Sequence, residues 1–397
     1  MILFLLFIIT SLLFGSYQVG PTTVRVYSTI LLILYIIFKK NLNKDKLQLP
    51  YKYIWIYLVF IFVSLLVKVF VDPAIIDTFI KNIFGFYLVA IISYVAVDFF
   101  VKKQSDIKKI VTVLTIIGVF NAWVSILQAM GNPLGFSLGS FFSTVSDTYL
   151  AKTIDMLEVN GYDMADVVVP GIFGHGATNG IMNSMLGILP LYFLSDKNKF
   201  MRVVGLFSTL YILIGGFYIQ ERSGFGLLIV ANLYALWKLF PHKYIILICL
   251  ILFCMYIFGG NINFDRLGRI SDFEYGDMRG DLMSNAHEFI GDHLLFGGET
   301  LYTQQYGMTP HNFILHSLIF SGLIGSVIII PLFIMMVIKS IRYIFASNFV
   351  ISIYIFACAT LIYHLNSLFH SNSLIIGDNI LWLVFALLLR SVQINKI

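Results

Sequence analysis

Residues 313–336 read FILHSLIFSGLIGSVIIIPLFIMM, an apolar run that contains no Asp, Glu, Lys or Arg. An α-helix needs about 20 consecutive apolar residues to cross the hydrocarbon core of a bilayer, so this run is long enough to span a membrane. Comparable runs recur along the whole chain. We place them at residues 1–16, 25–38, 53–71, 80–98, 108–130, 171–194, 203–220, 223–240, 244–260, 312–338, 348–365 and 374–391.

The repetition of these runs predicts the fold class. Helices are favoured within lipid because they satisfy their backbone polar groups internally. We therefore predict an all-α integral membrane protein, a polytopic bundle of about 12 transmembrane helices, with one membrane domain over residues 1–397. Residues 1–16 lack a basic n-region and a small-residue cleavage site, so we interpret them as a first span and not as a signal peptide.

The composition argues against a soluble globular protein. Hydrophobic residues make up 59% of the 397 residues and charged residues only 12%, whereas soluble domains carry about 25% charged residues. So few charges would not cover the core of a soluble protein. The net charge of +5 is modest and gives no reason to expect a nucleic-acid partner.

The charges divide the predicted connecting segments into a basic face and an acidic face. Most of the 26 Lys and Arg residues fall in every second segment and at the end of the chain, in residues 39–52, 102–109, 197–202, 238–243, 339–342 and 390–396. Basic segments stay on the cytoplasmic side, so both termini are predicted to be cytoplasmic and these charges to be solvated anchors. The carboxylates on that side are Asp45, Asp98, Asp106 and Asp196, and the rest of the 21 lie outside.

Two outer segments, residues 131–170 and 261–311, are much longer than the others. Both mix aromatic and apolar residues with charged ones. That mixture favours partial helices packed over the membrane domain instead of disordered linkers.

Arg222 is the first candidate site residue. Residues 221–224 read Glu-Arg-Ser-Gly within residues 203–236, which are otherwise uncharged. A guanidinium binds phosphate oxygens in a bidentate manner, and free N–H groups at a helix start point toward the same anion. We predict an anion site at Arg222. The alternative is a local pair with Glu221 at the interface.

The second long outer segment carries further candidates. Arg266, Arg269 and Arg279 lie among acidic residues that we expect to form a solvated face. The segment ends at His311-Asn312, directly before the apolar run. A histidine titrates near neutrality and so suits proton transfer or contact with phosphate, although a lone histidine is often structural.

A metal or nucleotide site is not predicted. His287 and His293 are six residues apart, which is not the i, i+4 spacing that aligns two ligands on a helix. No Gly-rich loop with a Lys follows a predicted strand. We therefore expect no cofactor and no metal.

Four motifs, in order along the chain, resemble a known family. His311-Asn312, nine residues, and then residues 322–325 (GLIG) resemble the His-Asn, nine-residue, Gly-x-x-Gly pattern of the O-antigen ligase and O-antigen polymerase (Wzy) superfamily. Arg222-Ser223-Gly224 is similar to its Arg-Ser/Thr-Gly at a helix start. Arg279 falls where the family often has an Arg in the large outer loop.

The fourth motif is residues 171–179 (GIFGHGATN) followed by Leu189-Pro190, which resembles the family's Gly-x-Phe…Asn…Leu-Pro pattern. The resemblance covers about residues 167–340. Two positions depart from the pattern: Thr178 replaces a common Pro, and residues 293–297 (HLLFG) replace a His-Pro-Leu-x-Gly element.

The resemblance implies a GT-C-like glycosyltransferase in the bacterial inner membrane. The donor would be an oligosaccharide on undecaprenyl diphosphate, used at the periplasmic face without a metal. A polymerase would join it, as an inverting enzyme, to a second lipid-linked unit, with a chain-length regulator protein as a further partner. A ligase would transfer it to lipid A–core.

The family pattern also implies roles for particular residues. Arg222 and Arg279 would bind the diphosphate and stabilise it as leaving group. His311 would either remove the acceptor proton or contact the phosphate. The remaining substrate-binding candidates are Asn179, Glu221, Arg266, Arg269 and Asn312.

We favour the polymerase over the ligase because the chain is small and rich in Ile, Phe, Asn, Lys and Tyr. A flippase or transporter of lipid-linked glycans is the alternative from another class. It is expected to show inverted repeats, broken helices or charges at mid-membrane, whereas the unusual charges here cluster on one outer face.

Overall fold

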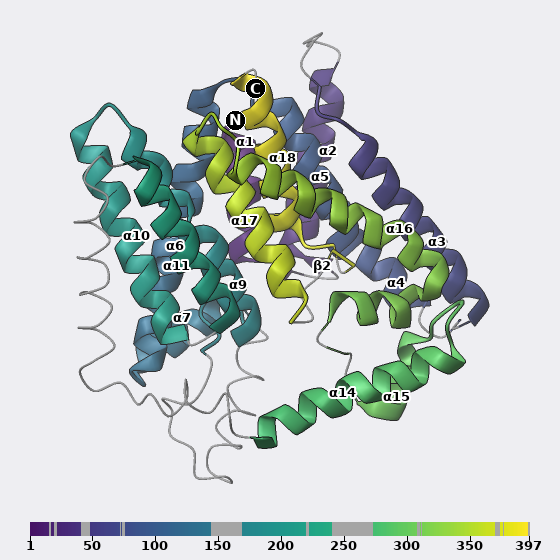
Figure 1. Cartoon of the computed structure of the whole chain (residues 1–397). Helices are drawn as coiled ribbons and strands as arrows, with labels where there is room; N and C mark the ends of the chain where they lie inside the picture. Colours follow the sequence, from purple (N-terminus) through teal and green to yellow (C-terminus); the bar gives the residue numbers. More distant parts are fainter. Residues whose placement is uncertain are drawn as a thin grey trace.

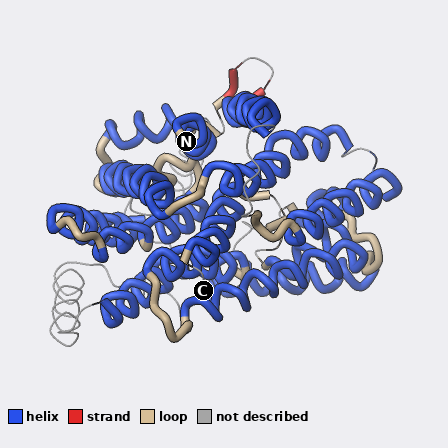
Figure 2. Tube along the Cα trace, turned by 90° about the horizontal axis from the view of Figure 1, so that it is seen from above, coloured by secondary structure: helices blue, strands red, loops and turns tan. Residues whose placement is uncertain are grey.

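The computed structural model describes residues 1–15, 17–19, 22–40, 48–71, 73, 76–143, 169–219, 222–239, 273–307, 310, 312–369, 374–375 and 377–395. At residues 18, 40, 222–223 and 273–281 it describes the backbone and not the side chain. Within these ranges the only strands are β1 (Gln18–Val19) and β2 (Thr22–Thr23), which form a short antiparallel pair beside the helices (Figure 2).

The helices form a bundle in which long helices lie side by side (Figure 1). Their bounds are α1 (Ile2–Leu13), α2 (Val24–Lys40), α3 (Lys52–Val71), α4 (Ile76–Asn82), the π-helical η2 (Ile83–Tyr87), α5 (Leu88–Phe100), α6 (Gln104–Ala129), α7 (Pro133–Phe142), α9 (Gly176–Gly187), the 3₁₀-helical η4 (Leu189–Ser195), α10 (Lys199–Ile219), α11 (Arg222–Leu239), α14 (Phe273–Asp292), α15 (Glu299–Tyr306), α16 (Phe313–Ile344), α17 (Ile351–Ser367) and α18 (Asn379–Ile394).

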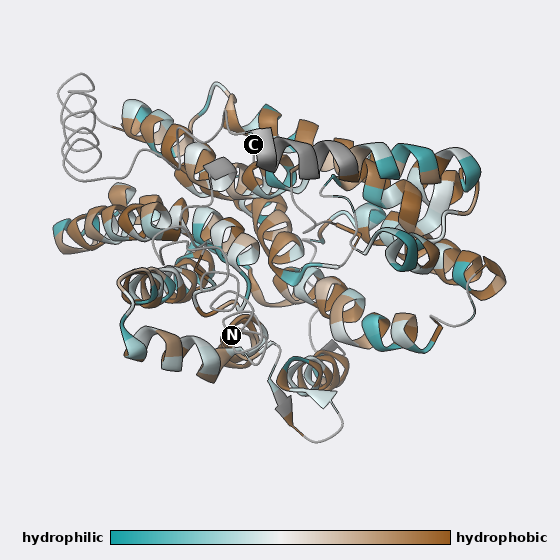
Figure 3. Ribbon diagram, turned by 90° about the horizontal axis from the view of Figure 1, so that it is seen from below, coloured by the Kyte–Doolittle hydropathy of each residue, from teal (hydrophilic) through white to brown (hydrophobic). Residues whose placement is uncertain are grey.

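The described part of the chain contains five helical segments that are long and apolar enough to cross a membrane: α3, the continuous segment Ile76–Phe100, α6, α10 and α16. Shorter apolar helices are α1, α17, α18 and the Gly224–Leu239 part of α11. Hydrophobic residues cover most of these helices (Figure 3). The predicted all-α membrane fold is confirmed at this level, whereas about 12 crossings and a GT-C-like arrangement stay predictions.

The predicted spans coincide with helices or with consecutive helices, apart from residues 244–260, which lie outside the described residues. Residues 171–194 differ in detail. There α9 ends at Gly187 and a 3₁₀-helix follows, because Pro190 has no N–H and its ring would clash with the carbonyl four residues earlier.

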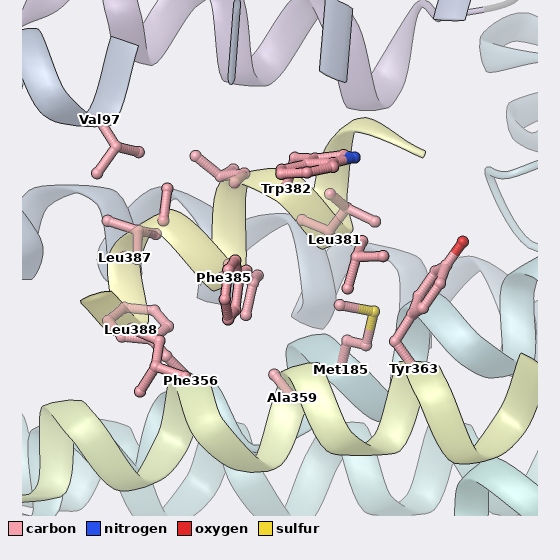
Figure 4. Packing of buried hydrophobic residues seen from close by; sticks show 14 of the residues in the cluster. Val97, Met185, Phe356, Ala359, Tyr363, Leu381, Trp382, Phe385, Leu387 and Leu388 are labelled. Carbon is pink, nitrogen blue, oxygen red and sulfur yellow. The ribbon is translucent and has the colours of Figure 1, made fainter. Parts of the chain in front are cut away.

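The segment α9–η4 lies in the centre of the bundle. It packs against α6, α10, α11 and α17, and all of residues 179–194 are buried. Met185 of α9 lies between Ala359 and Tyr363 of α17, with Trp382 and Phe385 of α18 beyond it (Figure 4). The innermost predicted span is therefore covered by protein.

Contacts between helix termini define two opposite ends of the bundle. At one end Gln393 Nε2 donates to the Gln48 carbonyl at 2.8 Å, and Lys108 pairs with Asp196. These segments were predicted to share the cytoplasmic side, and both termini lie at this end in Figure 1. Helices α7, α14 and α15 lie at the opposite end, which we call the outer end.

The basic residues at this end were expected to be solvated, and one of them, Arg390, is buried in an ion pair instead. The Arg390 side chain is fully buried and pairs with Asp98. Asp98 also accepts hydrogen bonds from the Leu49 N–H at 2.8 Å and the Tyr51 hydroxyl at 2.7 Å. Arg390 lies on α18, which is covered on all sides, so its charge is tolerated only because it is paired and hydrogen-bonded.

Partial helices in the two long outer segments were predicted, and the described residues of both segments contain them. Helix α7 lies in the first segment, and α14 and α15 lie in the second. Ala286, Phe289 and Tyr302 of the second segment pack with Leu315 and Ile319 of α16 in an apolar cluster separate from the main core. The second outer segment is thereby fixed to the start of α16.

Candidate functional site

Three buried or half-buried ionisable side chains meet at the outer end, and each comes from a different helix. Lys68 lies three residues before the end of α3, Glu299 begins α15, and His316 is in the first turns of α16. The Lys68 ammonium is 3.0 Å from one Glu299 carboxylate oxygen, and His316 Nε2 is 3.6 Å from the other. We call Lys68, Glu299 and His316 the outer charge cluster.

The outer charge cluster is shielded from solvent. The side chains of Lys68 and His316 are 4% and 5% exposed, and that of Glu299 is 23% exposed. The Lys68 ammonium also lies 3.9 Å from the Phe320 ring centroid, a cation–π contact. Neither ring nitrogen of His316 has a hydrogen-bond partner among the described residues.

The environment of Glu299 keeps it ionised. Burial raises the pKa of the Glu299 carboxyl, but the His316 imidazole and the Lys68 ammonium outweigh burial and lower the pKa to about 2. Glu299 therefore balances the buried Lys68 charge at neutral pH.

Helix α16 is broken at Gly322, directly beside this cluster. Gly322 has φ 61° and ψ −166°, a conformation that is essentially restricted to glycine. The backbone groups freed by the break pair with the outer segment. Leu323 N donates to the Leu294 carbonyl at 2.8 Å, and the Gly298 N–H donates to the Ile319 carbonyl at 2.8 Å.

A second glycine completes the contact. Gly297 has φ 68°, and a Cβ there would lie 2.7 Å from the Leu318 carbonyl oxygen and 2.8 Å from Gly322 N. A Cβ on Gly322 would overlap the Leu295 carbonyl. Residues 293–297 and 322–325, noted separately in the sequence, are thus two sides of one close backbone contact.

Asn312 was predicted to bind substrate, which stays a prediction, and the structure places it at a helix start. It is the N-cap of α16, where its Oδ1 accepts hydrogen bonds from Ile314 N at 2.9 Å and Leu315 N at 3.2 Å. Its Nδ2 donates to the Leu368 carbonyl at the end of α17 at 3.2 Å. The Asn312 amide is occupied in starting one helix and fastening it to the next.

Asn179, also predicted to bind substrate, is fully buried among protein groups. Its Nδ2 donates to Ser125 Oγ at 3.1 Å and to the Val169 carbonyl at 2.8 Å, and its Oδ1 accepts from Asn121 Nδ2 at 2.8 Å. Gly171 has φ 56°, and a Cβ there would lie 2.7 Å from Asn179 Cγ. Asn179 therefore holds the turn at Gly171, and its role in substrate binding stays a prediction.

The backbone of Arg222 lies at the outer end of the bundle. Because Lys108 pairs with Asp196, α10 begins at the end of the bundle that holds the termini. Helix α10 has 21 residues, or about 31 Å at 1.5 Å per residue, so it ends at the outer end. Arg222, the first residue of α11, follows there.

Side chains of several candidates lie beyond what the structure describes. For Arg222 and Arg279 only the backbone is described, and Arg279 belongs to α14, which packs against α16. His311, Glu221, Arg266 and Arg269 lie outside the described residues. Their predicted roles stay predictions.

The outer charge cluster was not predicted, although the sequence contains a signal for it. Lys68 and His316 each lie inside an apolar run, and an ionisable residue within a transmembrane segment is a functional-site hypothesis by default. Glu299 carried no such signal, because it lies among the acidic residues of the outer segment.

Among the described residues no group of three or more His, Cys, Asp and Glu side chains is arranged to hold a metal ion. No protein-family model matches the chain, and no curated protein matches it.

Proposed function

We propose that the protein is an O-antigen-type polymerase. Such a glycosyltransferase joins lipid-linked oligosaccharide units at the outer, periplasmic face of the inner membrane. The donor and the acceptor are oligosaccharides on undecaprenyl diphosphate, and the enzyme lies in a bacterial inner membrane with both termini cytoplasmic. The proposal rests on the four motifs of the sequence together with the way the fold arranges two of them.

The observation that carries the proposal is that two motif positions, at the starts of α11 and α16, lie at the same end of the bundle. Arg222 begins α11 and Asn312 caps α16, and both helices start at the end that carries the long outer segment. A polyprenyl diphosphate has its charge at the headgroup level and its tail in lipid. The positive end of a helix dipole at that depth favours an anion there.

In the proposed reaction the acceptor hydroxyl attacks the anomeric carbon of the donor, and the lipid diphosphate leaves. Arg222 and Arg279 bind the diphosphate and stabilise its developing charge. His311, next to the Asn312 cap, either takes the acceptor proton or contacts the phosphate.

The decisive assay uses purified protein and one synthetic lipid-linked repeat unit, with neither nucleotide nor lipid A–core. The proposal expects a ladder of products that differ by one repeat. If product forms only after lipid A–core is added, the enzyme is the ligase. If neither substrate is consumed by folded, monodisperse protein, the glycosyltransferase proposal is wrong.

The break in α16 favours one further candidate, a flippase of lipid-linked glycans. Discontinuous helices and buried charges are typical of transporters, and α16 and the outer charge cluster provide both. The backbone freed at Gly322 pairs with the outer segment, so we rank this candidate second. Movement of a fluorescent lipid-linked glycan across the vesicle membrane, without formation of a new glycosidic bond, would favour the flippase.

A further inference from the structure

Residues 293–298 lie against α16 as a tight turn, although they belong to an outer segment. Four backbone hydrogen bonds hold the turn: Gly297 N to His293 O at 2.8 Å, Gly298 N to Ile319 O at 2.8 Å, Leu323 N to Leu294 O at 2.8 Å and Ile324 N to Leu295 O at 3.4 Å. The turn therefore occupies the level of residues 319–324 of α16.

That level can be compared with the membrane boundary. Lys339 and Arg342 lie near the end of α16, on the rim that carries the basic residues. The unbroken helix from Leu323 to Lys339 rises about 24 Å at 1.5 Å per residue, which is less than the roughly 30 Å of the hydrocarbon core, so the outer boundary lies beyond Leu323. The partners of the turn, Leu323 and Ile324, fall just inside that boundary.

The side chains of the turn are apolar and exposed. Leu294, Leu295 and Phe296 are 45%, 55% and 47% exposed. Three apolar residues of α16 continue this surface and are also exposed: Leu323, Ile324 and Val327. A contiguous exposed apolar surface marks an interaction site, and its continuity with a spanning helix identifies lipid chains as the occupant.

We propose that residues 293–298 form a shallow re-entrant turn that enters the outer edge of the lipid hydrocarbon and presents Leu294, Leu295 and Phe296 to lipid chains. Irregular backbone is tolerated at membrane depth only when protein satisfies its polar groups, and the break at Gly322 supplies the partners. The ion pair of Glu299 with Lys68, directly after the turn, fastens the chain where it leaves the lipid.

The test measures where a nitroxide label at position 295 lies. Leu295→Cys is made in a chain whose own cysteines, Cys249, Cys254 and Cys358, are replaced by alanine, labelled in detergent and reconstituted into phosphatidylcholine vesicles. Matched variants are Val327→Cys on the lipid-facing side of α16 and Gln304→Cys on exposed α15. Power saturation compares collisions with oxygen, which dissolves in lipid, and with a water-soluble nickel chelate.

The proposal expects the oxygen-to-nickel collision ratio at position 295 to exceed one, as at 327, and to fall below one at 304. A ratio at 295 that matches position 304 would overturn it, because the turn would then lie in water. Low collision with both reagents would overturn it too, because a protein partner would cover the surface. If Leu295→Cys yields no folded protein, Phe296→Cys provides the same comparison.

Discussion

At the residue scale, the outer charge cluster shows how a buried charge can be tolerated in an apolar bundle. Desolvating an ammonium such as that of Lys68 costs several kcal/mol unless a counter-charge lies close by. Glu299 provides that counter-charge at 3.0 Å, and its pKa near 2 keeps it ionised over the physiological range. The cluster therefore joins α3, α15 and α16 electrostatically, in addition to the apolar contacts between these helices.

Glu299→Gln is expected to destabilise the folded protein by about 3 kcal/mol, because it leaves Lys68 buried without its counter-charge. Thermal unfolding in detergent measures the loss. Glu288→Gln, at an exposed position of α14, is the matched control and should change little. An equal effect of the two substitutions would contradict the role given to the Glu299–Lys68 pair.

The same pair has a defined pH dependence. The folded-state pKa of Glu299 lies below its ordinary value of 4.5, at about 2. A group whose pKa is lowered by folding stabilises the folded state above its unfolded pKa and loses that contribution as the pH falls through the folded value. The stability difference between wild type and Glu299→Gln should therefore be constant at neutral pH and shrink between about pH 4.5 and 2.

Arg222→Lys keeps the positive charge but loses the planar fork that binds a diphosphate in a bidentate manner. One such transition-state contact is worth roughly 10²–10³-fold in rate, so the polymer ladder should form that much more slowly at unchanged protein level. Arg202→Lys, at an exposed position on the opposite end of the bundle, should leave the rate unchanged. Near-normal ladders from Arg222→Lys would remove Arg222 from the proposed site.

At the element scale, the start of α16 could be predicted from the sequence, but its internal break could not. The apolar run from residue 312 to 338 was interpreted as one uninterrupted span, and its start is confirmed by the Asn312 cap. The break at Gly322 could not be predicted from local sequence, because α16 reaches that conformation only with Gly297 and Leu294 of the outer segment as partners. The buried contacts of Asn179 could not be predicted for a related reason, since its partners Asn121 and Ser125 lie on another helix.

Gly322→Ala is expected to destabilise the protein by about 2 kcal/mol or more, because a side chain is strained at φ 61° and would overlap the Leu295 carbonyl. Gly226→Ala is the control. A Cβ at Gly226 of α11 meets nothing within 4 Å, and Ala favours a helix interior over Gly by about 1 kcal/mol. Thermal unfolding should therefore separate the two variants in opposite directions, and equal stabilities would contradict the described break.

At the scale of the whole molecule, two independent properties divide the bundle in the same way. The basic residues of the sequence assign the connecting segments to two sides, and the contacts bring those of each side together, as Gln48 meets Gln393 at one end and Lys68 meets Glu299 at the other. Hydropathy and charge were sufficient for this division because each depends on single residues. Hydropathy and charge were not sufficient to predict the number of membrane crossings. Helices α9 and α18 are short and buried, so their length and apolarity do not show what surrounds them.

The orientation of the bundle follows from this division and can be tested in intact cells. The basic end is expected to face the cytoplasm, which would put the start of α11 and the outer charge cluster on the outer side. We predict that a membrane-impermeant thiol reagent labels Gln304→Cys on α15 in whole cells, whereas Ser105→Cys at the start of α6 reacts only after the membrane is permeabilised. Both positions are exposed, so accessibility within the protein is matched. The reverse pattern would place the proposed diphosphate site in the cytoplasm, where a periplasmic polymerase has no acceptor.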